Sequence, residues 1–201
     1  MVKVKFLLVL LAGGLMAAPA VQAAELKGRT KEIVTERCSL CHGVEGESAS
    51  AIYPRLAAQN ETYIVKQLRD FRDGRRTGTM NEMARELTDD EINGLAAYFS
   101  SRKATSKRPS NMDLSGVGKY IFHYGNPWSG IAACASCHGE KGVGTVQLPR
   151  LAGQHPAYIE GQLTDFSKGS RTNDKSIMHV IASKMTMLEI KAVATYIGGL
   201  E

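Results

Sequence analysis

The strongest constraint on the fold of this 201-residue chain is a five-residue pattern that occurs twice. The order cysteine, two residues, cysteine, histidine is found at Cys38–His42 and again at Cys134–His138, and a glycine follows each copy. The two copies contain all four cysteines of the sequence. Such a repeat indicates that each half of the chain performs the same chemistry with its two thiols and its imidazole.

This spacing is typical of covalent haem attachment. Two thiols about one helical turn apart can each add to one vinyl group of a haem, and the adjacent histidine then faces the iron. We therefore predict two covalently bound haem c groups. The predicted thioether links use Cys38, Cys41, Cys134 and Cys137, and the predicted proximal iron ligands are His42 and His138.

Cysteines at this spacing have three other possible uses. Two disulfides are possible in an exported chain, because that compartment is oxidising. A zinc site would need both cysteine pairs, but four-sulfur zinc domains have far shorter gaps between their halves. A thioredoxin-like redox pair needs a strand before the motif, whereas residues 29–38 have a helical pattern.

The likeness between the two halves extends far beyond the motif. Residues 53–80 and 148–178 share Pro-Arg-Leu-Ala, Gln, Tyr, Gln-Leu, Asp-Phe, Gly and Arg-Thr in the same order. Residues 80–99 then match 178–197, once a three-residue insertion in the second copy is allowed. We interpret this pattern as the tandem duplication of one small domain.

The first residues predict export. A basic head, an apolar run and the small residues Val21 and Ala23 are typical of a signal peptide that is cleaved after Ala23, which predicts that the mature protein is exported. The run is too short for a good transmembrane span, and an uncleaved anchor is the alternative. The predicted division is a signal peptide at 1–23, a first domain at 24–101, a linker at 102–113 and a second domain at 114–201.

The hydrophobic pattern predicts an all-α fold, in which each domain wraps around one haem. The apolar residues recur at helical spacing, and no alternating strand pattern competes with them. Thr-x-x-Glu sequences mark the starts of the last helices, because this pattern forms capping boxes. The expected helices are 29–38, 61–74 and one from Thr88 in the first copy, and 116–125, 156–169 and one from Thr186 in the second.

Methionine is the candidate for the second axial position of each iron. Met80 and Met178 are the methionines that align across the repeat, so we predict them as the distal ligands. We interpret Met83, Met185 and Met187 as core residues. His179 is an alternative ligand, but its counterpart in the first copy is Asn81. His123 and His155 have no partner in the other copy and are read as ordinary structural or surface histidines.

Coordination by histidine and methionine favours electron transfer over catalysis. A thioether favours ferrous iron and raises the reduction potential relative to two histidines. When both axial positions are filled, a substrate has no free site on the iron. A diheme peroxidase would need one open or displaceable position, and the paired methionines argue against that enzyme.

With these motifs, the chain resembles the diheme cytochromes c4. The resemblance covers the sequence after the signal peptide and includes both CxxCH motifs, the Pro-Arg-Leu-Ala segments and the placement of Met80 and Met178. It implies two tandem class I cytochrome c domains related by a pseudo-twofold axis, with the haem propionates facing the domain interface. It also implies a periplasmic electron carrier of a respiratory chain, with a quinol-oxidising membrane complex or another donor and a terminal oxidase as acceptor.

The same resemblance suggests further haem contacts. In class I c-type cytochromes a proline carbonyl accepts a hydrogen bond from the proximal histidine, and Pro54 and Pro149 occupy that place. Arg55 and Arg150 follow directly. They are candidates to pair with haem propionates, and a solvated arginine is the alternative for each.

The net charge limits the choice of partners. Removal of Lys3 and Lys5 with the signal peptide lowers the net charge from +5 to +3, and about one negative charge per ferric haem brings it near +1. No arginine-rich helix with aromatic residues is present, so we expect no nucleic-acid partner. We expect redox proteins as partners and allow peripheral membrane association. The alternative function is a diheme subunit of a larger oxidoreductase, such as a sulfide-oxidising flavocytochrome.

One departure from the family is an apolar start of the last helix in the second domain, where a family member would carry an acidic one. Met187 and Leu188 occupy positions where a polar residue would be expected after the capping threonine. These residues either form a surface for a partner or are buried between the domains.

Overall fold

The computed structural model describes residues 28–106, 109 and 111–201. The predicted signal peptide and the first residues of the predicted first domain lie outside this range. The described residues form helices joined by turns, and the only β-type pairing among them is an isolated bridge between Asn126 and Ile131. The prediction of an all-α fold is confirmed.

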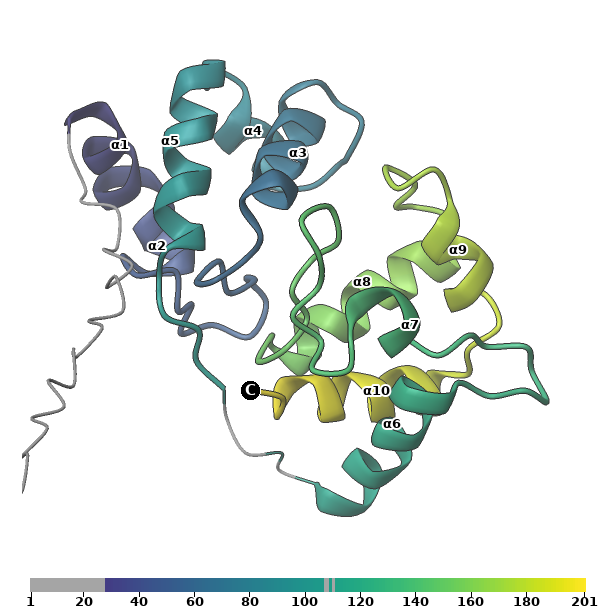
Figure 1. Cartoon of the computed structure of the whole chain (residues 1–201). Coiled ribbons are helices and arrows are strands. Elements are labelled where there is room, and N and C mark those ends of the chain that lie inside the picture. Colours follow the sequence, from purple (N-terminus) through teal and green to yellow (C-terminus); the bar gives the residue numbers. More distant parts are fainter. Residues whose placement is uncertain (1–27, 107–108, 110) are drawn as a thin grey trace, which may run out of the picture.

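The helices form two groups that lie side by side (Figure 1). The first group consists of α1 (Gly28–Ile33), a π-helical segment (Val34–Cys38), α2 (Ser39–His42), α3 (Glu61–Arg72), α4 (Met80–Ala84) and α5 (Asp89–Ser100). The second consists of α6 (Met112–Tyr124), α7 (Ala135–His138), α8 (Pro156–Ser167), α9 (Ile177–Ala182) and α10 (Met187–Gly198). None of these helices is long and apolar enough to cross a membrane.

The starts of the last helices are fixed by capping boxes, as predicted. The hydroxyl of Thr88 accepts a hydrogen bond from the backbone N–H of Glu91 at 3.2 Å, and the Glu91 carboxylate accepts one from the Thr88 N–H at 2.8 Å. Thr186 and Glu189 repeat this arrangement with the same two distances. Each box satisfies backbone donors that the first helical turn leaves free.

The first helices of the two domains differ in how they reach the haem motif. In the first copy the helix continues through the π-helical segment directly to Cys38. In the second copy α6 begins at Met112, inside the predicted linker, and ends before Gly125, whose φ of 72° turns the chain. A turn closed by Asn126 and Ile131 then precedes α7. The helix predicted at 116–125 is therefore present, but it starts four residues earlier and this turn separates it from the second motif.

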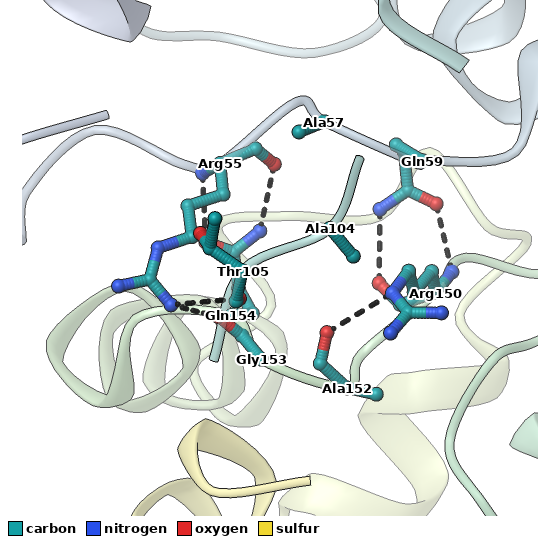
Figure 2. Close-up of a pocket in the computed structure, with 9 residues that line it drawn as sticks. All are labelled: Arg55, Ala57, Gln59, Ala104, Thr105, Arg150, Ala152, Gly153 and Gln154. Carbon is teal, nitrogen blue, oxygen red and sulfur yellow. Dashed lines mark hydrogen bonds between the residues drawn. The ribbon is translucent and has the colours of Figure 1, made fainter. Parts of the chain in front are cut away.

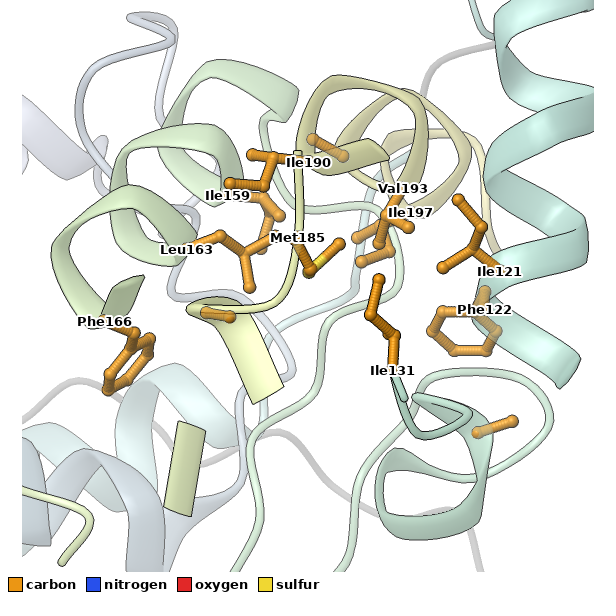
Figure 3. Packing of buried hydrophobic residues seen from close by; sticks show 13 residues of the cluster. Ile121, Phe122, Ile131, Ile159, Leu163, Phe166, Met185, Ile190, Val193 and Ile197 are labelled. Carbon is orange, nitrogen blue, oxygen red and sulfur yellow. The ribbon is translucent and has the colours of Figure 1, made fainter. Parts of the chain in front are cut away.

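Each domain has its own apolar core. In the first, α5 packs against α1 and α3, and in the second, α10 packs against α6 and α8. The least exposed large side chains are Val34, Ile92, Leu95 and Phe99 in the first core and Phe122, Ile190, Val193 and Ile197 in the second (Figure 3). Because burial of one such side chain contributes about 1.5–3 kcal/mol, these clusters hold the helices that carry the motifs.

Candidate haem centres

Both histidines that the sequence predicts as proximal ligands are buried and held through one ring nitrogen. His42 Nδ1 lies 2.9 Å from the carbonyl oxygen of Pro54, and His138 Nδ1 lies 3.3 Å from that of Pro149. A carbonyl can only accept, so Nδ1 carries the proton and Nε2 keeps its lone pair for a metal. Burial lowers the pKa of both rings, and the carbonyl contact offsets this in part. The neutral ring, which is the form that binds iron, is thereby favoured.

None of the four cysteines forms a disulfide, so the alternative use of these residues in two disulfides is not found. Before haem is attached, burial raises the pKa of Cys38 and Cys134 to about 11. Within the described residues no group of three or more His, Cys, Asp or Glu side chains is placed to hold a metal ion. The two cysteine pairs therefore do not assemble a single zinc site there.

Met80 and Met178 occupy equivalent places in the two domains. Met80 is the first residue of α4, and Met178 is in the first turn of α9. Each is partly buried against the core of its own domain, and the first cysteine of the motif, Cys38 or Cys134, packs against that same core. The structure thus places a thioether and an attachment thiol on one apolar cluster in both copies. The two short helices were not foreseen from the sequence.

The residues that follow these methionines anchor them to the central helices. The Asn81 side chain donates a hydrogen bond to the carbonyl of Phe71 at 2.6 Å. At the equivalent position His179 Nδ1 lies 2.8 Å from the carbonyl of Phe166. Histidine therefore does in the second copy what asparagine does in the first. This shared anchoring role explains His179 without iron coordination.

The remaining methionines do not behave alike. Met185 is buried in the second core, and its repeat counterpart Leu87 is buried in the first, so the interpretation of Met185 as a core residue is confirmed. Met83 and Met187 are 43 % and 66 % exposed, and the expectation that they lie in the core was wrong.

The Pro-Arg-Leu-Ala segments of the two domains face each other across the interface (Figure 2). The Gln154 side chain accepts a hydrogen bond from the Arg55 N–H at 2.8 Å and donates one to the Arg55 carbonyl at 3.0 Å. The Gln59 side chain bonds the N–H and carbonyl of Arg150 in the same way, at 2.7 and 2.9 Å. These reciprocal pairs relate the two domains by an approximate twofold axis.

The guanidinium groups of Arg55 and Arg150 lie beside these pairs and contact carbonyl oxygens. Arg55 donates to the carbonyls of Glu47 and Thr105 at 3.2 and 3.3 Å, and also to that of Gly153. Arg150 Nε donates to the Ala152 carbonyl at 3.2 Å. Burial lowers the pKa of both arginines, and neither forms an ion pair with a described carboxylate. A cation held in this way favours an anionic partner, and a haem propionate is such an anion.

Two further arginines, which sequence reasoning did not single out, cross the interface. Arg171 donates to the Tyr63 hydroxyl at 2.9 Å and to the Gln67 side chain at 3.1 Å. Its counterpart donates to the equivalent residues of the second domain, as Arg76 contacts Tyr158 at 3.1 Å and Gln162 at 2.6 Å. The repeated Arg-Thr pairs were the available signal for this contact.

This network changes the acidity of a buried phenol. Burial would raise the pKa of Tyr63, but Arg171 and Arg76 outweigh it and hold that pKa below the usual range. The two arginines therefore favour the ionised form of this phenol relative to a free tyrosine. Tyr63 and Tyr158 thus lie between the domains, where each is bonded to an arginine of the other domain.

The insertion in the second copy adds a contact without a symmetric counterpart. Asn173, within the inserted loop, donates from Nδ2 to Asp70 of the first domain at 2.6 Å, and its carbonyl accepts from Lys66 at 2.6 Å. Asp70 also accepts from Arg75 at 2.8 Å and pairs with Lys66. The loop that leads to Met178 is thus attached to α3 of the other domain.

Known proteins share this arrangement. Residues 26–99 match the family described as cytochrome c oxidase, cbb3-type, subunit III, and residues 129–201 match the cytochrome c family. Cytochrome c4 of Pseudomonas aeruginosa is 41 % identical over 81 % of this chain and 83 % of that protein. The chain belongs to the cytochrome c4 family. The crystal structure of reduced recombinant cytochrome c4 from Pseudomonas stutzeri matches with a TM-score of 0.79 at 37 % identity, over 87 % of this chain and all of that one.

Membership in the cytochrome c4 family confirms three predictions. The fold is that of two tandem class I cytochrome c domains. The chain carries two covalently bound haem c groups and is an electron-transfer cytochrome. A further relative is the thiosulfate dehydrogenase electron acceptor of Thiomonas intermedia, which is 38 % identical over 80 % of this chain and 76 % of that protein.

Proposed function

We propose that this cytochrome c4 works in the periplasm as a closed two-centre carrier of a respiratory chain and delivers electrons to a terminal oxidase. The observation that carries the proposal is the repeated pairing of a buried histidine, held through Nδ1, with a methionine on the core beside the attachment cysteine. The predicted signal peptide at 1–23 supports export to the periplasm.

We assign four axial ligands and four attachment thiols. The first iron is assigned to His42 and Met80 and the second to His138 and Met178, with thioether links at Cys38, Cys41, Cys134 and Cys137. Bound haem iron supplies a centre that accepts and releases one electron. The Pro54 and Pro149 carbonyls orient the imidazoles. In the holoprotein the two methionines would occupy the iron positions that a substrate would need. A role as carrier, without an enzymatic reaction at either iron, follows from this assignment.

The buried arginines complete the assignment. Arg55 and Arg150 flank a cavity of about 10 Å³ at the interface, which is enough for about one water molecule. Because neither guanidinium has a carboxylate partner among the described residues, we assign each to a haem propionate. The propionate edges of both haems would then be directed toward the interface, which supports transfer between the centres.

Oxidase turnover tests the respiratory role. Reduced holoprotein is mixed with a purified cbb3-type oxidase, and oxygen uptake is recorded with the cytochrome as the only donor. We expect both haems to be oxidised, with two electrons delivered per chain, and no carbon monoxide binding to the reduced cytochrome. Carbon monoxide binding to one haem of the unmodified protein would contradict the closed-site assignment.

A second candidate is supported by the likeness to the thiosulfate dehydrogenase electron acceptor. In this second role the chain accepts electrons from a sulfur-oxidising enzyme, either as a free partner or as a bound subunit. The bound form corresponds to the alternative predicted from the sequence, a diheme subunit of a larger oxidoreductase. Rapid reduction by purified thiosulfate dehydrogenase with thiosulfate, and tight copurification with such an enzyme, would favour it. Reduction by a quinol-oxidising complex alone would favour the respiratory role.

A further inference from the structure

We propose that the second domain docks a redox protein whose contact face is apolar with carboxylates at its rim. The docking surface, here named the Trp128 surface, consists of Trp128, Met187 and Leu188, with Lys184 and Lys191 at its edge. The inference rests on the proposed carrier function. Beyond that function, the inference names the domain that contacts the partner and the kind of side chains that the partner presents.

The three apolar residues of the Trp128 surface are freely exposed. Trp128 is 97 % exposed and is the only tryptophan of the sequence, while Met187 and Leu188 are each 66 % exposed. Tryptophan is highly buried on average in folded proteins, because its large apolar ring is costly to leave in water. Large exposed apolar groups next to one another mark interaction sites. The exposure of Met187 and Leu188 also excludes the alternative that they are buried between the domains.

An ordered turn presents Trp128 beside the start of α10. The backbone groups of Asn126 and Ile131 exchange two hydrogen bonds of 2.9 Å, which close the turn. The Asn126 side chain donates to Glu189 at 2.7 Å, and Lys184 donates to the Gly130 carbonyl at 3.1 Å. These contacts attach the turn on both sides of the exposed residues at the start of α10. In Figure 1 this region lies at the end of α10 farther from the first domain.

The first domain shows that this composition is not required by the fold. Asp89 and Asp90 occupy the positions equivalent to Met187 and Leu188. Acidic residues in the first turn stabilise a helix through its dipole, and Asp89 also pairs with Arg72 at 2.9 Å. The second copy lacks both aspartates and the ion pair and keeps only Glu189 as an acidic residue in this turn. Met187 and Leu188, which replace the aspartates, are left exposed by the described residues.

The charge of the Trp128 surface and its position near Cys134 indicate which kind of protein binds there. The rim residues Lys184 and Lys191 correspond to Glu86 and Asn93 in the first domain, so the second copy has become more basic at this edge. A basic rim is complementary to a partner with surface carboxylates and steers its approach. The turn ends three residues before Cys134, where the second haem is attached. A protein docked here would lie next to that haem, which is what electron exchange requires.

A bilayer is the other surface that an exposed tryptophan and lysines could meet. The Trp128 surface favours a protein because it is small and adjoins the attachment cysteine, while membrane binding needs no such position. The test below separates the two.

The test is electron exchange with a defined probe, plant plastocyanin, a soluble copper protein with an apolar face and a neighbouring acidic patch. Second-order rate constants are measured by stopped flow at low ionic strength for the holoprotein, Trp128→Ser and Met187→Asp. The matched control is Met112→Asp, because Met112 is also the first residue of its helix and is 58 % exposed. We expect about tenfold slower exchange for each variant of the Trp128 surface and no change for the control.

Small-molecule redox agents and vesicles decide between the outcomes. All variants should be oxidised by hexacyanoferrate at the rate of the unmodified protein, which shows that the haems are intact. Equal plastocyanin rates in all variants would overturn the docking proposal alone. Binding to phosphatidylglycerol vesicles that is lost in Trp128→Ser, with unchanged plastocyanin rates, would overturn it in favour of a membrane surface. If the unmodified holoprotein cannot be cycled with hexacyanoferrate at all, the carrier function fails as well.

Discussion

The two domains are alike inside and unlike around the helix starts near their haem motifs. Leu87 and Met185 fill the same core position, and Thr88 and Thr186 make the same capping boxes. One residue later, an ion-paired Asp89 in the first domain corresponds to an exposed Met187 in the second. The comparison teaches that the parts that hold a haem and start a helix were retained after duplication. The exposed residues that follow the capping threonines diverged.

The interface has the same mixture of symmetry and difference. Gln59 and Gln154 make reciprocal bonds to the facing backbone segments. Only the second domain, however, extends an inserted loop whose Asn173 bonds Asp70 of the other domain. The two haems therefore lie in related but unequal surroundings, and their reduction potentials should differ.

The largest expected effect comes from removing one pair of thiols. Cys134→Ala with Cys137→Ala should leave one haem per chain, on the first domain, because each motif serves its own core. The matched variant, Cys38→Ala with Cys41→Ala, should leave one haem on the second domain. Intact mass and pyridine haemochrome absorbance measure this. Loss of both haems on changing either pair would contradict the independence of the two centres.

Next in size is the effect of the arginines that cross the interface. Arg171 is 8 % exposed and bonds Tyr63 and Gln67 of the first domain, so Arg171→Ala should lower the free energy of unfolding by about 3 kcal/mol. Arg76 is more exposed, and Arg76→Ala should cost about 1 kcal/mol. Urea denaturation of the holoprotein measures both. Equal losses would show that burial does not distinguish the two contacts.

Acid should weaken the contact that only one domain makes. Burial raises the pKa of Asp70, but Lys66, Arg75 and Asn173 outweigh it and hold the pKa below its usual range. The stabilisation is therefore fully present above the unfolded pKa of about 4 and is lost as the pH falls through the lower folded value. Unfolding free energy measured against pH should fall in this acidic window.

The control for Asp70 is its repeat counterpart. Asp70→Asn should flatten the fall of the unfolding free energy at acidic pH. The described bonds of Asp165 all stay within its own domain, so Asp165→Asn should leave that fall unchanged. If the dependence of the unfolding free energy on pH is the same in Asp70→Asn as in the unmodified protein, the contact of Asp70 with the inserted loop does not cause the acid sensitivity.

The smallest expected effect concerns the surface that distinguishes the domains. The double variant Met187→Asp with Leu188→Asp places aspartates where the first domain has Asp89 and Asp90. It should raise the unfolding free energy by about 0.5–1 kcal/mol, because acidic residues in the first turn interact favourably with the helix dipole. The same variant should slow exchange with plastocyanin. Thermal denaturation followed by circular dichroism measures the first effect. A loss of stability would mean that these apolar side chains stabilise the fold after all.

Local signals made much of this structure predictable from the sequence. The haem motifs and the capping boxes are fixed by residues within five positions of each other, and α3 and α8 begin at the predicted residues. The start of α6 at Met112 was missed, although Asn111 was a visible cap, since its side chain accepts from the Leu114 N–H at 2.8 Å.

Contacts between distant segments were not predictable in the same way. The bonds of Arg171 to Tyr63 and of Asn173 to Asp70 depend on how two complete domains pack, and no local pattern records that packing. Likewise, helical periodicity cannot tell whether Met187 faces a core or solvent when it is the first residue of its helix. These residues became interpretable only in the folded chain.

The central claim is that each haem is closed by histidine and methionine, and the optical spectrum of the holoprotein tests it most directly. We expect two haems per chain with the weak far-red band of iron–methionine coordination. The band should be reduced in Met80→Ala and in Met178→Ala and absent in the double variant, while both haems remain attached. A band that survives the double variant, or an unmodified protein in which one haem lacks the band and binds carbon monoxide, would contradict the account.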